Sequence, residues 1–296
     1  MTDERTKPQP FRVTVTADDF GLTASVNEAV ERAHRSGVLT SASLMVAGGA
    51  ASDAVDRARR MPTLCVGLHV VVADGQPVSR PTEIPSLVDR RGQLPRNLVR
   101  ASLRYFLRAD ARRQLRAEVR AQFQAFRATG LMLEHVDTHH HLVLHPTVLG
   151  IILELAPEFG IRVVRLPAEP WRATRGAPLR VRAAAAVRVA CLAPWLATVR
   201  LRLRRAGIAC NREVRGLAET GAIDEATLLR LISTVDRDGT EIFLHPATDS
   251  LSSVPLPQPI GRHVAELEAL CSPRARAALE KLGAEPVGLH ALARVR

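Results

Sequence analysis

The stretch FRVTVTADDFG, residues 11–21, decides the fold class of this chain. It begins with a short β-like run, 11–16, that has apolar residues at every second position, and Asp18 and Asp19 follow directly. Two adjacent carboxylates resist joint ionisation, so such a pair indicates a bound cation, a shared proton or two separate roles. Neighbouring strand residues point to opposite sides, which favours separate roles. The alternative is that one aspartate caps the helix expected to begin near Thr23.

The rest of the chain alternates short β-like runs with longer helical patterns. This alternation predicts an α/β fold built on a mainly parallel sheet. We expect strands at 11–16, 41–46, 65–70, 133–137, 163–166 and 241–244. We expect helices at 26–35, 50–60, 111–128, 146–159, 225–235, 264–270 and 273–282, and two helical pieces divided at Pro194 within 180–205.

The same pattern predicts the domain organisation. Residues 1–10 are polar and mixed in charge, without the apolar segment of a signal peptide, and are expected to form a flexible tail. Residues 11–296 are expected to form one domain. Within it, an irregular stretch at about 73–110 is expected to be an insertion or lid, and about 172–212 a basic helical segment. Four scattered cysteines, none at metal-ligand spacing, favour a cytoplasmic protein with reduced thiols.

The positive charge is concentrated in one segment. The chain has 296 residues, 46% of them apolar, and a net charge of +11, but 170–212 alone holds ten arginines and no acidic residue. Aromatic residues make up only 3% of the chain, so stacking platforms for nucleic acid are scarce. We therefore expect no nucleic-acid partner.

Metal-compatible or acid–base side chains lie at or just after the carboxyl ends of four predicted strands. They are Asp18 and Asp19, His69, His139 to His141, and His245. Each histidine alone has a purely structural explanation, but ligands and catalytic groups gather at the carboxyl edge of parallel sheets. One carboxylate and two imidazoles form a ligand set that leaves positions open on a catalytic metal. The second carboxylate and the remaining strand-end histidine are then candidates for base and acid.

Four motifs in this order carry a family resemblance. They are TADDFG at 16–21, VGLH at 66–69, HVDTHHH at 135–141 and FLHPA at 243–247. Together they resemble the YdjC-like carbohydrate deacetylases, a family that includes chitooligosaccharide deacetylases. The segments 26–34 and 37–40 further resemble the subgroup associated with hopanoid biosynthesis, which removes acetyl from a lipid bearing N-acetylglucosamine.

The resemblance implies an irregular (β/α) barrel of six or seven mainly parallel strands and a role for each site residue. Asp19, His69 and His139 would hold one divalent metal ion, Mg²⁺ or Zn²⁺, with Asp18 as general base and His245 as general acid. Three further residues would contact substrate or support the ligands: Asp137 behind His139, His141 in the sugar pocket, and Arg165. His140 should point the other way. Val143 stands where relatives often have another histidine.

The implied function is hydrolytic N-deacetylation of an N-acetylated amino sugar, the head of an N-acetylglucosaminyl hopanoid lipid, with acetate released. One alternative is deacetylation of a chitooligosaccharide or another carbohydrate. The others are a metal-dependent phosphoesterase and a noncatalytic module that binds sugar or lipid. The arginine-rich segment is either a solvated helix face or an interfacial helix, and in the second case the protein contacts anionic lipid at the inner face of the membrane. The sequence leaves the oligomeric state open, with a homodimer as one option.

Overall fold

The structure is a computed structural model that describes residues 11–236, 238–249 and 262–294. The tail expected at 1–10 lies outside the described residues. All strand pairs in the described part of the chain are parallel. The strands are β1 (Phe11–Phe20), β2 (Ser41–Leu44), β3 (Cys65–Val70), β4 (Val136–Thr138), β5 (Glu213–Arg215), β6 (Thr240–Leu244) and β7 (Ala284–Pro286).

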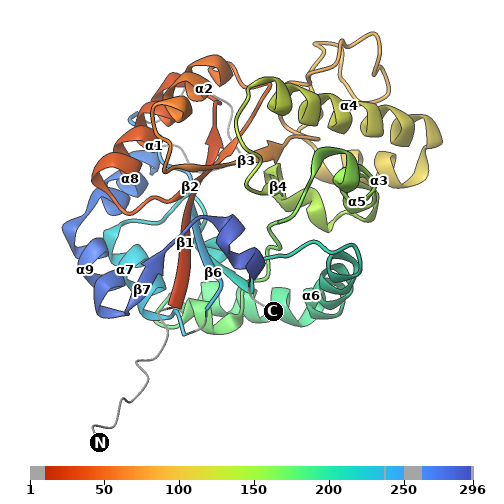
Figure 1. Cartoon of the computed structure of the whole chain (residues 1–296). Coiled ribbons are helices and arrows are strands. Elements are labelled where there is room, and N and C mark those ends of the chain that lie inside the picture. Colours follow the sequence, from red (N-terminus) through yellow and green to blue (C-terminus); the bar gives the residue numbers. More distant parts are fainter. Residues whose placement is uncertain (1–10, 237, 250–261, 295–296) are drawn as a thin grey trace, which may run out of the picture.

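These strands form one curled sheet in the order β4-β3-β2-β1-β6-β5, and β7 pairs with the first residues of β1 (Figure 1). The sheet describes a half-barrel, which confirms the prediction of an α/β fold with six or seven mainly parallel strands. Its helices lie around the outside of the curl (Figure 1). They are α1 (Ala24–Ser36), α2 (Ala51–Arg59), α3 (Leu98–Leu107), α4 (Ala109–Ala128), α5 (Pro146–Phe159), α6 (Leu179–Arg205), α7 (Glu225–Ser233), α8 (His263–Cys271) and α9 (Pro273–Lys281).

Strand β1 is the centre of the sheet. Successive residues of a strand face opposite sides, and Val13, Thr14, Val15 and Thr16 are all buried, so β1 is covered on both faces. It extends to Phe20, four residues beyond the predicted end. The aspartate pair therefore belongs to the last three residues of a buried strand.

The predicted insertion is tied to the body of the protein. The buried carboxylate of Glu118, on α4, accepts hydrogen bonds from the backbone N–H groups of Val78 and Ser79, each at 2.9 Å. The hydroxyl of Tyr105, on α3, donates to the carbonyl of Val72 at 2.5 Å. The insertion contains α3, a helix that the sequence pattern did not reveal.

Two predictions about secondary structure are wrong. Residues 163–166 form only isolated bridges, from Val163 to Ala209 and from Val164 to Val136. The side chain of Asn211 bonds both the N–H and the carbonyl of Leu166, so a side chain takes the place of a neighbouring strand.

The second error concerns the arginine-rich segment, which is one continuous helix, α6, with Pro194 inside it. Proline removes one helical hydrogen bond, and the carbonyl of Ala190, four residues earlier, belongs to an exposed residue that water can reach. This relieves the cost of leaving that carbonyl without its helical partner. The helix therefore continues through Pro194.

Gly67 of β3 gives a test of this packing. A Cβ at Gly67 would lie 2.4 Å from atoms of the buried His135 ring, which is held by Ser43. Gly67→Ala should lower the free energy of unfolding by about 1–3 kcal/mol through overpacking, measured by urea denaturation. Gly49→Ala is the control, because its added Cβ meets nothing closer than 3.6 Å. Equal stability of the two variants would contradict this account of the packing.

Candidate metal centre and active site

The predicted strand-end residues come together at the carboxyl edge of the sheet. Asp18 and Asp19 end β1, His69 lies in β3, His139 follows β4 and His245 follows β6. All five are buried. The helix-capping alternative for the aspartates is excluded, because Thr23 caps α1 by accepting a hydrogen bond from the N–H of Val26.

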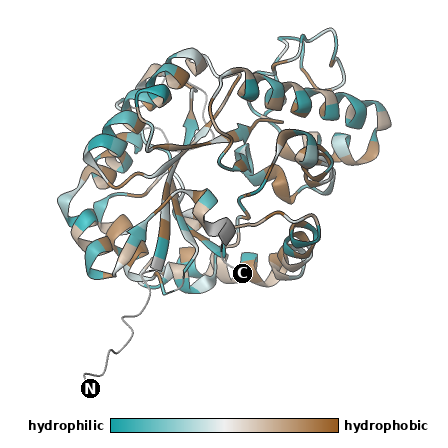
Figure 2. Ribbon diagram, viewed as in Figure 1, coloured by the Kyte–Doolittle hydropathy of each residue, from teal (hydrophilic) through white to brown (hydrophobic). Residues whose placement is uncertain are grey.

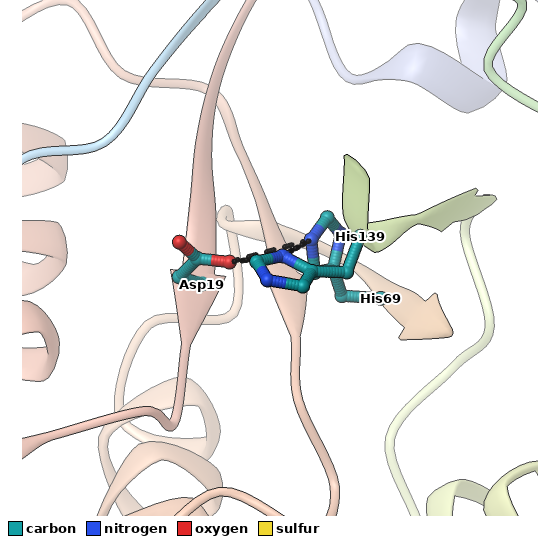
Figure 3. Close-up of side chains that lie close together, drawn as sticks. All are labelled: Asp19, His69 and His139. Carbon is teal, nitrogen blue, oxygen red and sulfur yellow. Dashed lines mark hydrogen bonds and ion pairs between the residues drawn. The ribbon is translucent and has the colours of Figure 1, made fainter. Parts of the chain in front are cut away.

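Three of these residues form a compact triangle of donor atoms (Figure 3). Asp19 Oδ1 lies 3.3 Å from His69 Nε2 and 3.2 Å from His139 Nδ1, and the two nitrogens are 3.4 Å apart. Donors that share one cation at about 2.0–2.2 Å are separated by a little over ~3 Å. Asp19 Oδ1 is also buried without a hydrogen-bond partner among the described residues. The set therefore fits a divalent metal ion.

The backbone adopts an uncommon conformation at Asp19 and directly after His139. Asp19 has a φ of +62°, and the register between β1 and β2 shifts between Ala17 and Phe20. After His139 the chain turns through His140 and His141, both with φ of +55°. Non-glycine residues rarely occupy this left-handed region, and when they do they cluster at functional sites.

Asp137 orients His69, and this corrects the prediction that it would lie behind His139. Its Oδ1 lies 2.9 Å from His69 Nδ1, so the other ring nitrogen of His69 faces the triangle. Asp137 contacts His69 because these two residues are paired in the register between β3 and β4. A carboxylate on the outer nitrogen fixes the orientation of a ligating imidazole.

Arg165 lies at the centre of a buried charge cluster. Its Nη1 contacts Asp18 Oδ2 at 2.7 Å and Asp137 Oδ2 at 2.5 Å, and its Nη2 contacts Glu241 Oε1 at 2.7 Å. Burial opposes the charge of Arg165, but the three carboxylates outweigh burial and raise the pKa of the guanidinium well above its usual value. Arg165 thus holds Asp18 in place, and Asp18 Oδ1 has no hydrogen-bond partner among the described residues.

His245 completes the group opposite the aspartates. Its Nε2 lies 3.9 Å from Asp18 Oδ2, and its Nδ1 is buried without a hydrogen-bond partner in the described part of the chain. Burial lowers the pKa of His245. The charges of Asp19 and Asp18 raise it again, but by less than burial lowers it, so the free imidazole is neutral at pH 7. Its backbone is fixed on both sides, by Glu266 at the N–H and His263 at the carbonyl.

The remaining predicted residues lie further out. His141 packs edge-on against Phe243, with ring centroids 5.3 Å apart, and burial lowers its pKa to about 3. His140 Nε2 contacts Asp74 of the insertion at 3.2 Å. Val143 is buried and belongs to the core.

Several buried residues of the site were missed by sequence reasoning. They are Ser43, His135, Glu241 and Glu266. Ser43 donates to Asp137 Oδ2 at 2.9 Å and contacts His135 Nε2 at 3.2 Å. Burial raises the pKa of Glu266 to about 7. His135 directly precedes β4 and was quoted in a motif without a role, and Ser43, Glu241 and Glu266 lie inside β2, β6 and α8.

A cavity of about 1030 Å³ leads from the surface to His139. One wall is the β2–α2 loop and the other is the insertion. The insertion contributes five arginines to its lining: Arg90, Arg91, Arg96, Arg100 and Arg104. This volume lies at the upper end of the range of small-molecule binding sites, about 300–1,000 Å³.

A family model described as YdjC-like protein matches residues 12–281. The chain belongs to the YdjC-like family. It is 41% identical over 153 residues to a protein of Brevibacillus brevis named carbohydrate deacetylase, covering 52% of this chain and 58% of the relative. A carbohydrate deacetylase of Geobacillus stearothermophilus is 38% identical over 161 residues, covering 54% and 60%. Each alignment spans less than two thirds of the relative's length.

A solved structure shares the fold of this YdjC-like chain. It is the crystal structure of a candidate cellobiose-phosphate cleavage protein from Enterococcus faecalis V583. The TM-score is 0.73 at 23% identity, covering 96% of this chain and 99% of the other. The likeness shows that the half-barrel extends over nearly the whole chain.

The triangle predicts which substitutions affect metal binding. His69→Ala and His139→Ala should each lose the divalent metal, and Asp137→Asn should weaken binding about 10- to 100-fold because it orients His69. The measurements are elemental analysis after dialysis and calorimetric titration with Zn²⁺ and Mg²⁺. His141→Ala is the matched control and should retain the metal. Retention by His69→Ala would show that the metal, if any, is held elsewhere.

Proposed function

We propose that this chain is a metal-dependent hydrolase that removes the acetyl group from an N-acetylated amino sugar. The observation that carries the proposal is the juxtaposition of a three-donor triangle with a second carboxylate, Asp18, and a buried histidine, His245. A noncatalytic binding module needs a pocket but no such acid–base pair. The names of the relatives support the same chemistry.

In the proposed reaction, Asp19, His69 and His139 hold one divalent ion, Mg²⁺ or Zn²⁺. That ion would supply Lewis acidity toward the acetamide carbonyl and lower the pKa of water at the site. Asp18, fixed by Arg165, takes a proton from the attacking water through its unpartnered oxygen. His245 protonates the departing amine. Because the free imidazole is neutral, it must first receive a proton, and Asp18 lies 3.9 Å away.

The substrate that we propose is an N-acetylglucosaminyl hopanoid lipid, with chitooligosaccharides as the main alternative. The segments 26–34 and 37–40 resemble the hopanoid-associated subgroup. The cavity of about 1030 Å³ has room for a sugar and part of its carrier. We place the reaction in the cytoplasm, at the inner face of the membrane.

We further propose that α6 makes peripheral contact with anionic lipid. Among the described residues it is the one helix whose length and composition would suffice to cross a bilayer, and 11% of its most apolar window is buried. It lies along the protein surface, however, because Arg188 pairs with Glu169 and Arg200 donates to backbone carbonyls of the loop that follows. Arg204 and Arg205 are exposed and remain available to lipid phosphates.

Replacing the proposed base separates catalysis from metal binding. Asp18→Asn should lower acetate release about 10²- to 10⁴-fold, because the amide cannot accept the proton, while metal content stays unchanged. Acetate is measured by an enzyme-coupled assay and metal by elemental analysis of the same sample. Unchanged acetate release would show that Asp18 is not the base, and loss of metal would show that it is a ligand.

A substrate panel tests the reaction class. Purified protein should release acetate from N-acetylglucosaminyl lipid in detergent, more slowly from chitooligosaccharides, and no phosphate from model phosphate esters. Addition of a chelator such as EDTA should abolish release, and added metal should restore it. Phosphate release without acetate would overturn the proposal in favour of a phosphoesterase.

A further inference from the structure

Helix α3 presents a largely exposed apolar face, on which Phe106 packs edge-on against His145 with ring centroids 6.4 Å apart. Val99, Leu103, Phe106 and Leu107 are 71%, 54%, 57% and 69% exposed. At 100° per residue these four positions fall within an arc about 80–100° wide, so they form one continuous stripe. Figure 2 shows part of α3 in brown, at the right-hand edge of the molecule.

The opposite face of α3 is firmly attached to the protein, so the stripe is held in place. Ala101 and Tyr105 are buried, and the Tyr105 hydroxyl donates to the carbonyl of Val72. Arg104 donates to the carbonyl of Ser86 at 2.8 Å. A well-anchored helix that exposes four large apolar side chains indicates a binding surface, because soluble surfaces rarely group such residues.

The surroundings of the stripe are strongly basic. Residues 96–113 contain six arginines and one acidic residue, Asp110, which is already paired with Arg108. Arg100 and Arg113 are exposed. Apolar side chains among arginines suit the boundary between acyl chains and anionic headgroups. Two copies of this face would instead bring like charges together, which disfavours pairing.

The stripe also adjoins the entrance of the active site. Asn97, Arg100 and Arg104 of the same helix region line the cavity that reaches His139. A surface that binds lipid beside this entrance would bring the cavity to the plane of the headgroups. This juxtaposition is independent of α6, which lies elsewhere on the protein (Figure 1).

We propose that the apolar stripe of α3 and its flanking arginines dock the protein on an anionic lipid bilayer, with the cavity entrance at the membrane surface. The inference does not rest on the proposed deacetylation, because docking is measured without turnover. Failure to dock would leave the deacetylase proposal intact, and absence of acetate release would leave docking intact.

The test is flotation of the full chain with vesicles of phosphatidylcholine alone or mixed with phosphatidylglycerol. The native protein should bind the anionic vesicles, with binding weakened by salt. A variant carrying Val99→Ser, Leu103→Ser, Phe106→Ser and Leu107→Ser should bind at least about tenfold more weakly. Met132→Ser is the apolar control, because Met132 is 75% exposed and precedes β4, so it lies toward the amino ends of the strands, whereas the cavity opens at their carboxyl ends.

A second pair of variants tests the charges. Arg100→Ser with Arg113→Ser should remove much of the salt-sensitive binding, whereas Arg32→Ser with Arg60→Ser, exposed on the side of α1 and α2, should not. Arg204→Ser with Arg205→Ser tests the α6 contact separately. Circular dichroism and thermal melting confirm that each variant is folded.

Three results would overturn the proposal. The first is absence of vesicle binding by the native protein. The second is equal binding by the native protein and the four-residue variant. The third is a native dimer in light scattering that becomes a monomer in the four-residue variant, with no lipid binding by either protein. The last result would assign the stripe to contact between two copies of the chain.

Discussion

One buried guanidinium holds the candidate active site together. Arg165 contacts carboxylates from β1, β4 and β6, the strands at the centre, at one edge and beside the centre of the sheet. Breaking a buried ion pair by removing one partner typically costs about 3–5 kcal/mol, because the other charge is left uncompensated. Arg165 is itself placed by its backbone N–H, which donates to the carbonyl of Val136 at 2.9 Å. Residues 163–166, which form isolated bridges and not a strand, therefore carry the guanidinium that contacts these three carboxylates.

Asp137 connects this charge cluster to the metal triangle. One of its oxygens orients His69, and the other accepts from Arg165 and Ser43. The same carboxylate thus fixes a proposed ligand and the arginine that fixes the proposed base. A substitution in the charge cluster around Arg165 therefore affects the metal triangle through Asp137, and the reverse also holds. The effects of substitutions in the two groups should not be additive.

The sequence predicted the strand-end residues because each follows an apolar run, and parallel strands bring their carboxyl ends to one edge. It also predicted helices such as α5, which begins at Pro146 and ends before Gly160. It could not predict that Asp137 faces His69, since this depends on register between β3 and β4. Nor could it identify Glu241 and Glu266, because nothing in local spacing distinguishes a buried carboxylate from a surface one. The exposed stripe of α3 could not be predicted either, because the helix itself was not recognised within the irregular stretch at 73–110. Apolar residues at helical spacing also ordinarily indicate a buried face, not an exposed one.

The balance of buried charge gives an independent reason to expect a cation at the triangle. Four buried carboxylates, Asp18, Asp19, Asp137 and Glu241, surround one arginine. Burial raises the pKa of Glu241, although Arg165 and Thr16 act in the opposite direction. Burial lowers the pKa of His69, but Asp137 and Asp19 outweigh burial and raise it well above its usual value, so His69 carries a compensating proton in the metal-free site. The four carboxylates still outnumber these two positive charges, and uncompensated buried charge is costly. Arg165 contacts Asp18, Asp137 and Glu241, and no contact between Arg165 and Asp19 is found among the described residues. A divalent ion between Asp19 and the two imidazoles would compensate the carboxylate that the arginine does not contact.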